Sequence, residues 1–280
     1  YPNLVVGAVA PSGPVLAQLD YVGYLEHFGE IAPAKCASQA QQAANDLATM
    51  LKYGHHKYIE QIFNSCGPLT SPEDINYFKF NVAGTLGSAD QFDNPPAMKT
   101  DPWPLNKTCD AFEAAPTPLL GLAAVCGGNE PQCTDYSLSN YLRTMGEPSN
   151  PDRAWMWQKC SEFGFFKGTG NSVFKALNVK SESIAALCEQ IFNRKGLLPN
   201  TTKINSEYGA MHPQASNVLF TNGRIDPWSV LSIRAPVGHV DAVLYDAGHC
   251  APMTKATAQD PVSLKAARLH VATFIEKILQ

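Results

Sequence analysis

The sequence predicts an α/β fold in which a large helical insertion interrupts a strand-rich domain. Strand-like apolar runs stand near both ends of the chain, helical signals fill the middle, and a well-marked helix closes it. We therefore expect a main-domain strand in residues 1–20, a helical cap domain in residues 21–209, and the last strands and final helix of the main domain in residues 210–280.

The expected strands are apolar runs that end in turn signals. The first lies in residues 3–15, NLVVGAVAPSGPV, and the Pro-Ser-Gly-Pro turn ends it. Its apolar residues run without polar breaks, as in a strand buried on both faces: Val5, Val6, Ala8, Val9 and Ala10. The next two open the stretches at residues 217–228, NVLFTNGRIDPW, and 241–250, DAVLYDAGHC. An Asn222-Gly223 turn is expected directly after the first of these two.

Helices are expected through the middle of the chain. Residues 37–54 place apolar side chains on one helical face and end at a glycine, a helix stop signal. Ser71 and Pro72 are candidates for the N-cap and first residue of another helix. Two more are expected in residues 152–166 and 181–192. The apolar face of the first helix consists of Ala40, Ala44, Leu47 and Leu51.

The final helix has the clearest start signal. Asp260 is its expected N-cap and Pro261 its first residue. The proline-rich stretches at residues 93–106 and 114–121 are expected to be loops. The apolar stripe of the final helix is expected to consist of Leu264, Ala267, Val271, Phe274 and Ile278.

These strands are too few for a complete parallel sheet with both faces covered. We therefore expect that an N-terminal part of the domain lies outside residues 1–280.

The bulk properties exclude several classes of function. The chain has 280 residues and a net charge of −4, so it offers no general basic character for a nucleic-acid partner. No window approaches the roughly 20 apolar residues that a membrane span needs. The adjacent His55 and His56 would point apart on a helix, so we expect no metal site, and no motif implies a cofactor.

The cysteines and sequons favour the secretory route. Eight cysteines are many for a cytosolic protein of this length, and no C-x-x-C pair indicates a zinc ribbon or a thioredoxin-like motif. The sequons at Asn106 and Asn200 are candidate glycosylation sites. The expected location is therefore secreted or lysosomal/vacuolar.

An aspartate and a histidine follow the last two expected strands: Asp226 in NGRIDPW and His249 in DAGHC. Ligands of α/β sheets bind at the carboxyl ends of strands, and in α/β-hydrolases the catalytic triad runs Ser, then Asp or Glu, then His. The histidine takes the serine proton, and the carboxylate orients the imidazole. Asp241 and Asp246 are rival acids, although Asp246 would have to fold back onto His249.

No serine is evident as the nucleophile. The chain lacks G-x-S-x-G, and Ser12 is the nearest candidate because it follows a strand and precedes Asp226 and His249. Pro14, however, stands where a nucleophile turn needs a small residue leading into a helix. Cys250 is next to His249 in sequence, and adjacent side chains diverge, so a structural role suits it better.

Four ordered stretches resemble one family of enzymes. They are YPNLVVGAVAPSGPV, WMWQKCSEFGFF, NVLFTNGRIDPWSVL and GHCAPM. They look like motifs of the lysosomal and secreted serine peptidases that include prolyl carboxypeptidase, dipeptidyl peptidase II and thymus-specific serine protease. GHCAPM is nearer to the thymus-specific and nematode-type members. The resemblance covers essentially the whole chain and implies an α/β-hydrolase with a helical cap.

The resemblance implies a serine-type carboxypeptidase or dipeptidyl-peptidase-like enzyme that prefers proline at the cleavage site of its peptide substrate. Family members carry Gly-Gly-Ser-Tyr-Gly-Gly shortly before the stretch matching residues 1–2. The chain would thus be a C-terminal part, inactive by itself, and the serine would come from a missing N-terminal segment or a separate chain of the same precursor. Trp228 would contact the substrate proline, Phe165 would line the proline pocket, and Glu162 would bind a substrate amine.

The resemblance also suggests three disulfides: Cys36–Cys109, Cys66–Cys133 and Cys160–Cys188. Cys126 is an alternative partner of Cys66, and Cys250 has no evident partner.

A homodimer of the processed enzyme is a candidate assembly. The alternative functions are an inactive hydrolase-like binding protein and an esterase or lipase of the same fold.

Overall fold

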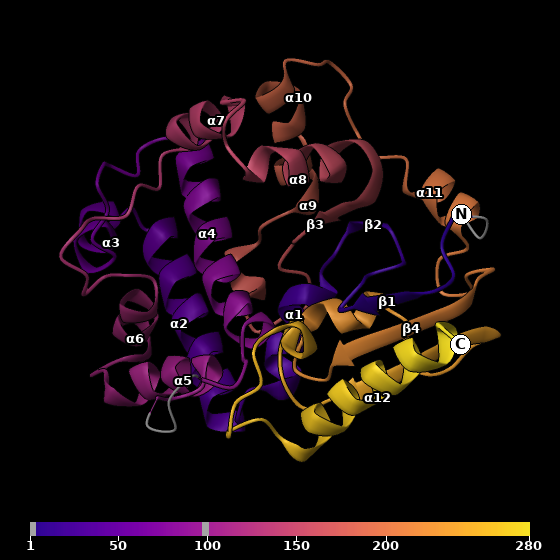
Figure 1. Cartoon of the computed structure of the whole chain (residues 1–280). Helices are drawn as coiled ribbons and strands as arrows, with labels where there is room; N and C mark the ends of the chain where they lie inside the picture. The colour runs from indigo at the N-terminus through magenta and orange to yellow at the C-terminus, as the bar shows by residue number, and fades with distance from the viewer. Residues whose placement is uncertain (1–3, 97–100) are drawn as a thin grey trace. The chain divides into compact units, whose positions relative to one another are not determined.

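The computed structural model describes residues 4–96 and 101–280 and contains two compact units, which are drawn together in Figure 1. The main unit comprises Tyr1–Ala17, Ala89–Asn106 and Thr202–Gln280, and the helical unit comprises Gln18–Ser88 and Lys107–Thr201. The cap insertion between residues 21 and 209 stays a prediction. Among the described residues, no helix is both long enough and apolar enough to cross a membrane.

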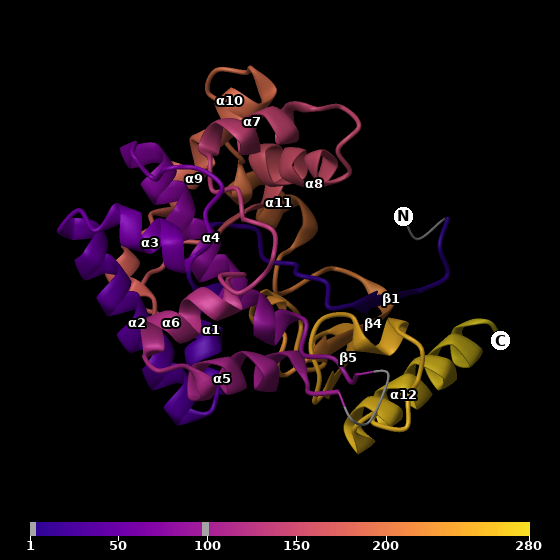
Figure 2. The same cartoon turned by 90° about the vertical axis from the view of Figure 1, so that its left-hand side faces the viewer.

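A parallel sheet forms the centre of the main unit. Its strands are β1 (Ala8–Pro11), β4 (Ser216–Gly223) and β5 (His239–Tyr245), in the order β1-β4-β5. Helix α12 (Val262–Ile278) packs against β5 and β4 (Figures 1 and 2). Because the strands are parallel, the loops that follow β4 and β5 leave the sheet at the same edge, where functional groups of α/β folds gather.

The strands differ from the sequence prediction at two places. Val5 and Val6 were expected to be buried in the first strand, but they precede β1 and are 52% and 65% exposed. Strand β4 continues through Asn222 and Gly223, which were expected to form a turn. A side chain at Gly223 would collide with the carbonyl oxygen of Ala247, so the glycine lets the two loops approach closely rather than reversing the chain.

The start of α12 also differs from the prediction. Asp260 does not cap the helix, and Pro261 precedes its first residue. The Asp260 carboxylate instead accepts hydrogen bonds from Thr257 and from the Arg268 guanidinium, the latter at 3.1 Å. A buried ion pair has therefore taken the place of the predicted cap. In the predicted apolar stripe, Leu264 and Ala267 are fully buried, and Val271, Phe274 and Ile278 are partly buried.

The helical unit contains most of the helices and one short two-stranded parallel sheet, β2 (Gln18–Asp20) with β3 (Gly164–Phe166). Helix α4 (Pro72–Gln91) ends and α5 (Pro104–Ala114) begins within the main unit. The main unit also holds α11 (Thr201–Tyr208) apart from its first residue. The remaining helices are α1 (Gly23–Ile31), α2 (Ala34–Lys52), α3 (His56–Ile62), α4 (Pro72–Gln91), α5 (Pro104–Ala114), α6 (Pro118–Val125), α7 (Leu138–Gly146), α8 (Asp152–Gln158), α9 (Ser181–Ala185) and α10 (Leu187–Phe192).

Several predicted helix signals are present. Helix α4 begins at Pro72, and the Ser71 hydroxyl accepts a hydrogen bond of 2.9 Å from the backbone N–H of Asp74. Helix α2 ends two residues before Gly54, which has a φ of +76°. The predicted apolar face of α2, Ala40, Ala44, Leu47 and Leu51, is buried.

Other local predictions were wrong. Residues 114–121 were expected to be a loop, but α6 begins there at Pro118, capped by Thr117. The loop expected at residues 93–106 includes the first turn of α5. The helix expected at residues 152–166 ends early: a π-helical turn follows α8, and Gly164 and Phe165 have φ values of +79° and +59° that no α-helix allows.

Three disulfides tie the helical unit together. All three pairs suggested by the family resemblance are present, with S–S distances of 2.12, 2.04 and 2.02 Å in chain order. Cys126, the alternative partner of Cys66, is a buried thiol, and burial raises its pKa to about 12. The pairs are Cys36–Cys109, Cys66–Cys133 and Cys160–Cys188.

Candidate active site

Asp226 lies in the loop that follows β4, and its side chain is fully buried. One carboxylate oxygen, Oδ1, accepts a hydrogen bond of 3.0 Å from the backbone N–H of Trp228 and so caps the short 3₁₀ turn Pro227–Leu231. The other, Oδ2, lies 2.9 Å from Nδ1 of His249. A buried carboxylate needs such partners, because a buried charge without a partner destabilises the folded state by several kcal/mol.

His249 lies in the loop that follows β5, the neighbour of β4 in the sheet. Its side chain is 27% exposed, whereas that of Asp226 is 0% exposed. The carboxylate therefore fixes the imidazole from the buried side through Nδ1, and Nε2 is the ring nitrogen that does not face Asp226. This is the relation between the acid and the base in a hydrolase triad.

The charge of Asp226 strongly affects the protonation of His249. Burial acts to lower the pKa of the imidazole, but the hydrogen bond and charge of Asp226, together with the thiol of Cys250, raise it from 6.5 to about 9. The site is thus built to stabilise an imidazolium, which is the state that a general base reaches when it takes a proton.

The rival acids have other partners. Asp246 forms an ion pair of 3.0 Å with Arg224. Asp241 lies 3.0 Å from Nε2 of His270 on α12. Only Asp226, of these three carboxylates, has a hydrogen bond to His249 in the described part of the chain.

Ser12 is not placed as a nucleophile. Its side chain is buried, with 2% of the residue exposed, and its hydroxyl accepts a hydrogen bond of 2.9 Å from the backbone N–H of Cys250. The same hydroxyl lies 3.3 Å from the hydroxyl of Tyr245. The Ser12 hydroxyl therefore holds the loop that carries His249. Ser12 has a strained φ of +50°, as a nucleophile in a tight turn after a strand can have, but its hydroxyl is used in these hydrogen bonds.

Trp228 lies beside the histidine. Its ring centroid is 6.4 Å from that of His249, and the two ring planes are inclined by 53°. The residue is 7% exposed, and its indole N–H donates a hydrogen bond of 3.0 Å to Oε1 of Gln91. The indole is thus held in one orientation next to the imidazole.

Comparisons with known proteins show the family of the chain. The family model described as serine carboxypeptidase S28 matches residues 1–271. The chain belongs to this family.

The S28 chain has curated relatives over nearly its whole length. It is 27% identical to the thymus-specific serine protease of Mus musculus, covering 100% of this chain and 60% of that protein. It is 24% identical to the lysosomal Pro-X carboxypeptidase of Homo sapiens, covering 96% of this chain and 57% of that protein. The chain thus spans somewhat less than two thirds of the length of these relatives.

The other predicted substrate residues of the S28 chain lie in the helical unit. Phe165 is 2% exposed and stacks on Phe163 and Trp155, with centroid distances of 5.8 and 6.2 Å. Glu162 is exposed at the end of the π-helical turn. Their roles stay predictions.

The predicted glycosylation sites of the S28 chain are on the surface: Asn106 on α5 and Asn200 just before α11 are both exposed. Among the described residues, no group of three His, Cys, Asp or Glu side chains is arranged to hold a metal ion.

One group of site residues was not found from the sequence. Residues 90–94, at and just beyond the end of α4, hydrogen-bond to the backbone of Gly248 and His249. The sequence offered only a proline-rich stretch here, because contacts between backbone groups far apart in the chain leave no local pattern.

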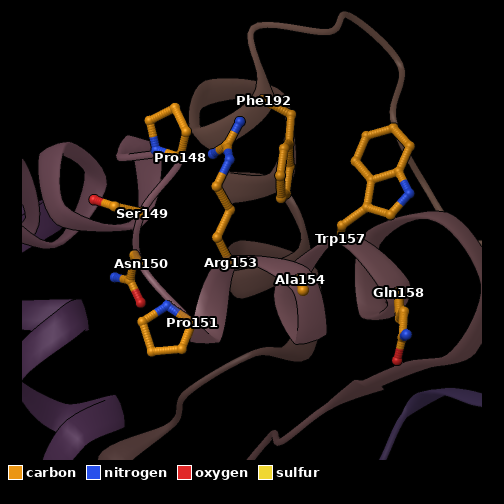
Figure 3. A pocket seen from close by; sticks show the side chains of 9 residues that line it. All are labelled: Pro148, Ser149, Asn150, Pro151, Arg153, Ala154, Trp157, Gln158 and Phe192. Carbon is orange, nitrogen blue, oxygen red and sulfur yellow. The ribbon is translucent and has the colours of Figure 1, made fainter.

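A cavity of about 710 Å³ in the helical unit is a separate feature (Figure 3). Its charged residue Arg153 donates a hydrogen bond of 2.8 Å to the carbonyl of Met145, and its guanidinium stands 4.5 Å from the ring centroid of Phe192. No carboxylate, imidazole or thiol lines the cavity, so it lacks acid–base groups. Its lining is Pro148, Ser149, Asn150, Pro151, Arg153, Ala154, Trp157, Gln158 and Phe192.

Proposed function

We propose that this chain supplies the acid and the base of a Ser-Asp-His triad in a serine peptidase. The observation that carries the proposal is the 2.9 Å hydrogen bond between His249 Nδ1 and the fully buried carboxylate of Asp226. His249 takes the hydroxyl proton of the serine on Nε2 as the serine attacks the peptide carbonyl, and later gives it to the leaving amine. Asp226 holds the ring and stabilises the imidazolium formed in between.

The nucleophile is proposed to lie outside residues 1–280, either earlier in the same polypeptide or on a separate chain cleaved from the same precursor. In the described part of the chain, β1 is paired with β4 alone, so its other edge can accept a further strand. Val5 and Val6, which precede β1, are exposed and support the same idea, because a further segment packed there would cover them. Such a segment would also bring the donors that stabilise the oxyanion, and the helical unit would be the cap of an α/β-hydrolase.

The proposed substrate is a peptide with proline at the cleavage site. The indole of Trp228, fixed beside His249, offers a flat apolar surface that suits a proline ring. A human relative is named lysosomal Pro-X carboxypeptidase, which supports a carboxypeptidase reaction. A dipeptidyl-peptidase-like reaction is proposed as its alternative. Phe165 is proposed as a further apolar substrate contact, and the exposed Glu162 as a partner for a substrate amine.

The test is peptide hydrolysis by the full-length protein and its variants. His249→Ala and Asp226→Asn are expected to lower kcat by about 10⁴-fold or more. Asp241→Asn is the matched control, because it changes a carboxylate that also bonds a histidine but does not contact His249. If both triad variants keep at least a tenth of wild-type activity, the assignment is wrong.

The same experiment separates the alternative functions. A wild-type protein that binds peptides without cleaving them would be a hydrolase-like binding protein. One that cleaves esters and no peptide would be an esterase or lipase. A proline series of substrates, matched in every other residue, tests the proposed preference at the cleavage site.

A secreted or lysosomal location is proposed as well. The three disulfides require an oxidising compartment for their formation, and one group of relatives is named lysosomal. Asn106 and Asn200 are proposed to carry glycans, which a mobility shift after glycosidase treatment would reveal. A homodimer of the processed enzyme is proposed as its assembly and is tested by sedimentation.

A further inference from the structure

The loop that carries His249, here called the histidine loop, is hydrogen-bonded along its backbone by residues from other segments of the main unit and by Tyr245 at the end of β5. The imidazole bond to Asp226 fixes one ring atom, whereas these bonds fix the backbone from which the ring projects. They run from Gly248 N to Asp93 O (2.9 Å), from His249 N to Gln91 O (2.7 Å), from Asn94 Nδ2 to His249 O (3.0 Å), from Cys250 N to Ser12 Oγ (2.9 Å), and from Tyr245 OH to Gly248 O (3.2 Å).

Three of these bonds come from residues 90–94, which we call the clamp segment. Helix α4 ends at Gln91, and the last carbonyl groups of a helix have no partner within it. The N–H of His249 supplies that partner for the carbonyl of Gln91. The helix end and the histidine loop therefore satisfy each other's backbone groups.

The clamp segment is itself well fixed. Asp93 is 5% exposed, and its carboxylate accepts a hydrogen bond of 2.9 Å from the backbone N–H of Leu105. Gly248 packs so closely on the segment that a Cβ there would lie 2.5 Å from the carbonyl oxygen of Gln91 and 2.8 Å from the nitrogen of Asp93. Any larger residue at position 248 would push the two backbones apart.

Gln91 also contacts the loop that follows β4 and carries Asp226, here called the aspartate loop. Its Oε1 accepts the indole N–H of Trp228 at 3.0 Å, and the backbone N–H of Trp228 donates to Asp226 Oδ1 at 3.0 Å. Gln91 thus bonds the histidine loop through its main chain and the aspartate loop through its side chain.

We propose that Gln91 and Asn94 are positioning residues for His249, a proposal that rests on the proposed function of His249 as general base. A base misplaced by about 1 Å can lose on the order of 100-fold in rate. Asn94 holds the carbonyl of His249, and Gln91 holds the aspartate loop at a fixed separation from the histidine loop. Neither residue touches the reacting atoms.

The test uses the full-length protein with Asn94→Ala, which removes the donor to His249 O, and Gln91→Met, which keeps the length of the side chain but removes the acceptor for Trp228. The matched control is Asn205→Ala. The Asn205 side chain makes two hydrogen bonds of 2.8 Å to the backbone of Ala17 in the same unit. Asn205→Ala therefore removes comparable side-chain hydrogen bonds but contacts neither the histidine loop nor the aspartate loop.

The readouts are kcat and KM on one peptide, together with the rate constant for labelling of the nucleophile by a fluorophosphonate. We expect Asn94→Ala and Gln91→Met to lower kcat and the labelling rate by about 10- to 100-fold, with KM changed less than about threefold. Asn205→Ala is expected to keep both rates within about twofold of wild type. Its thermal midpoint should fall about as far as those of Asn94→Ala and Gln91→Met.

The outcomes separate the two proposals. If the wild type neither cleaves peptide nor reacts with the label, the proposed function fails and the positioning role fails with it. If the wild type is active and the two variants match Asn205→Ala in kcat and labelling, the positioning role alone is overturned. Should Asn94→Ala not fold, the near-isosteric Gln91→Met decides the question by itself.

Discussion

Replacing Asp226 by asparagine is expected to lower the pKa of His249 from its value of about 9. In the wild type, burial acts to lower this pKa, and the Asp226 carboxylate and Cys250 act in the opposite direction. Asp226→Asn leaves the burial unchanged and removes the largest of the effects that raise the pKa, so the pKa should fall. The difference between 6.5 and 9 corresponds to about 3 kcal/mol in favour of the imidazolium.

The same shift predicts how stability depends on pH. Because the folded-state pKa of His249 lies above its unfolded value, this stabilisation is complete below about pH 6.5 and is lost as the pH rises through about 9. Asp226→Asn should abolish the change in that window, whereas Asp241→Asn should keep it.

An NMR titration of the imidazole Cε1–H signals in the full-length protein measures the pKa of His249, with His249→Gln to assign the resonance. A pKa of His249 that stays within about half a unit of wild type after Asp226→Asn would refute the electrostatic reasoning.

Three further predictions concern other parts of the chain. Replacing both Cys160 and Cys188 by serine opens a bridge with a sequence separation of 28 and is expected to cost about 3–4 kcal/mol; an unchanged thermal midpoint would contradict this. Gly223→Ala should strongly reduce the yield of folded protein, since the new methyl group meets the carbonyl of Ala247, and a normal thermal midpoint would show that this loop can move. Ser12→Ala should cost about 1–3 kcal/mol in stability but keep fluorophosphonate labelling, and loss of labelling at unchanged folding would make Ser12 the nucleophile.

The parts of the site that follow simple patterns could be predicted from the sequence. An apolar run that stops at a polar residue locates the end of a strand, and two such stops gave Asp226 and His249. Their hydrogen bond follows from parallel pairing of neighbouring strands, which puts both loops at one edge. The disulfide pairs did not follow from spacing and needed the family resemblance.

The parts that depend on tertiary contacts could not be predicted. Asp260 has the sequence position of a helix cap, but the guanidinium of Arg268, eight residues later, binds its carboxylate. The hydrogen bonds of Gln91 and Asn94 to His249 join groups more than 150 positions apart. The start of α6 is a different case, because Thr117 followed by proline is a recognisable cap signal that the density of prolines around it obscured.

The central claim is that His249 is the general base for a nucleophilic serine that lies outside residues 1–280. Labelling the full-length protein with a fluorophosphonate and locating the modified residue by peptide mass spectrometry tests it most directly. We expect one labelled serine outside this range, with labelling lost in His249→Ala and kept in Ser12→Ala. A label on a serine or on Cys250 within residues 1–280, or labelling that survives His249→Ala, would contradict it.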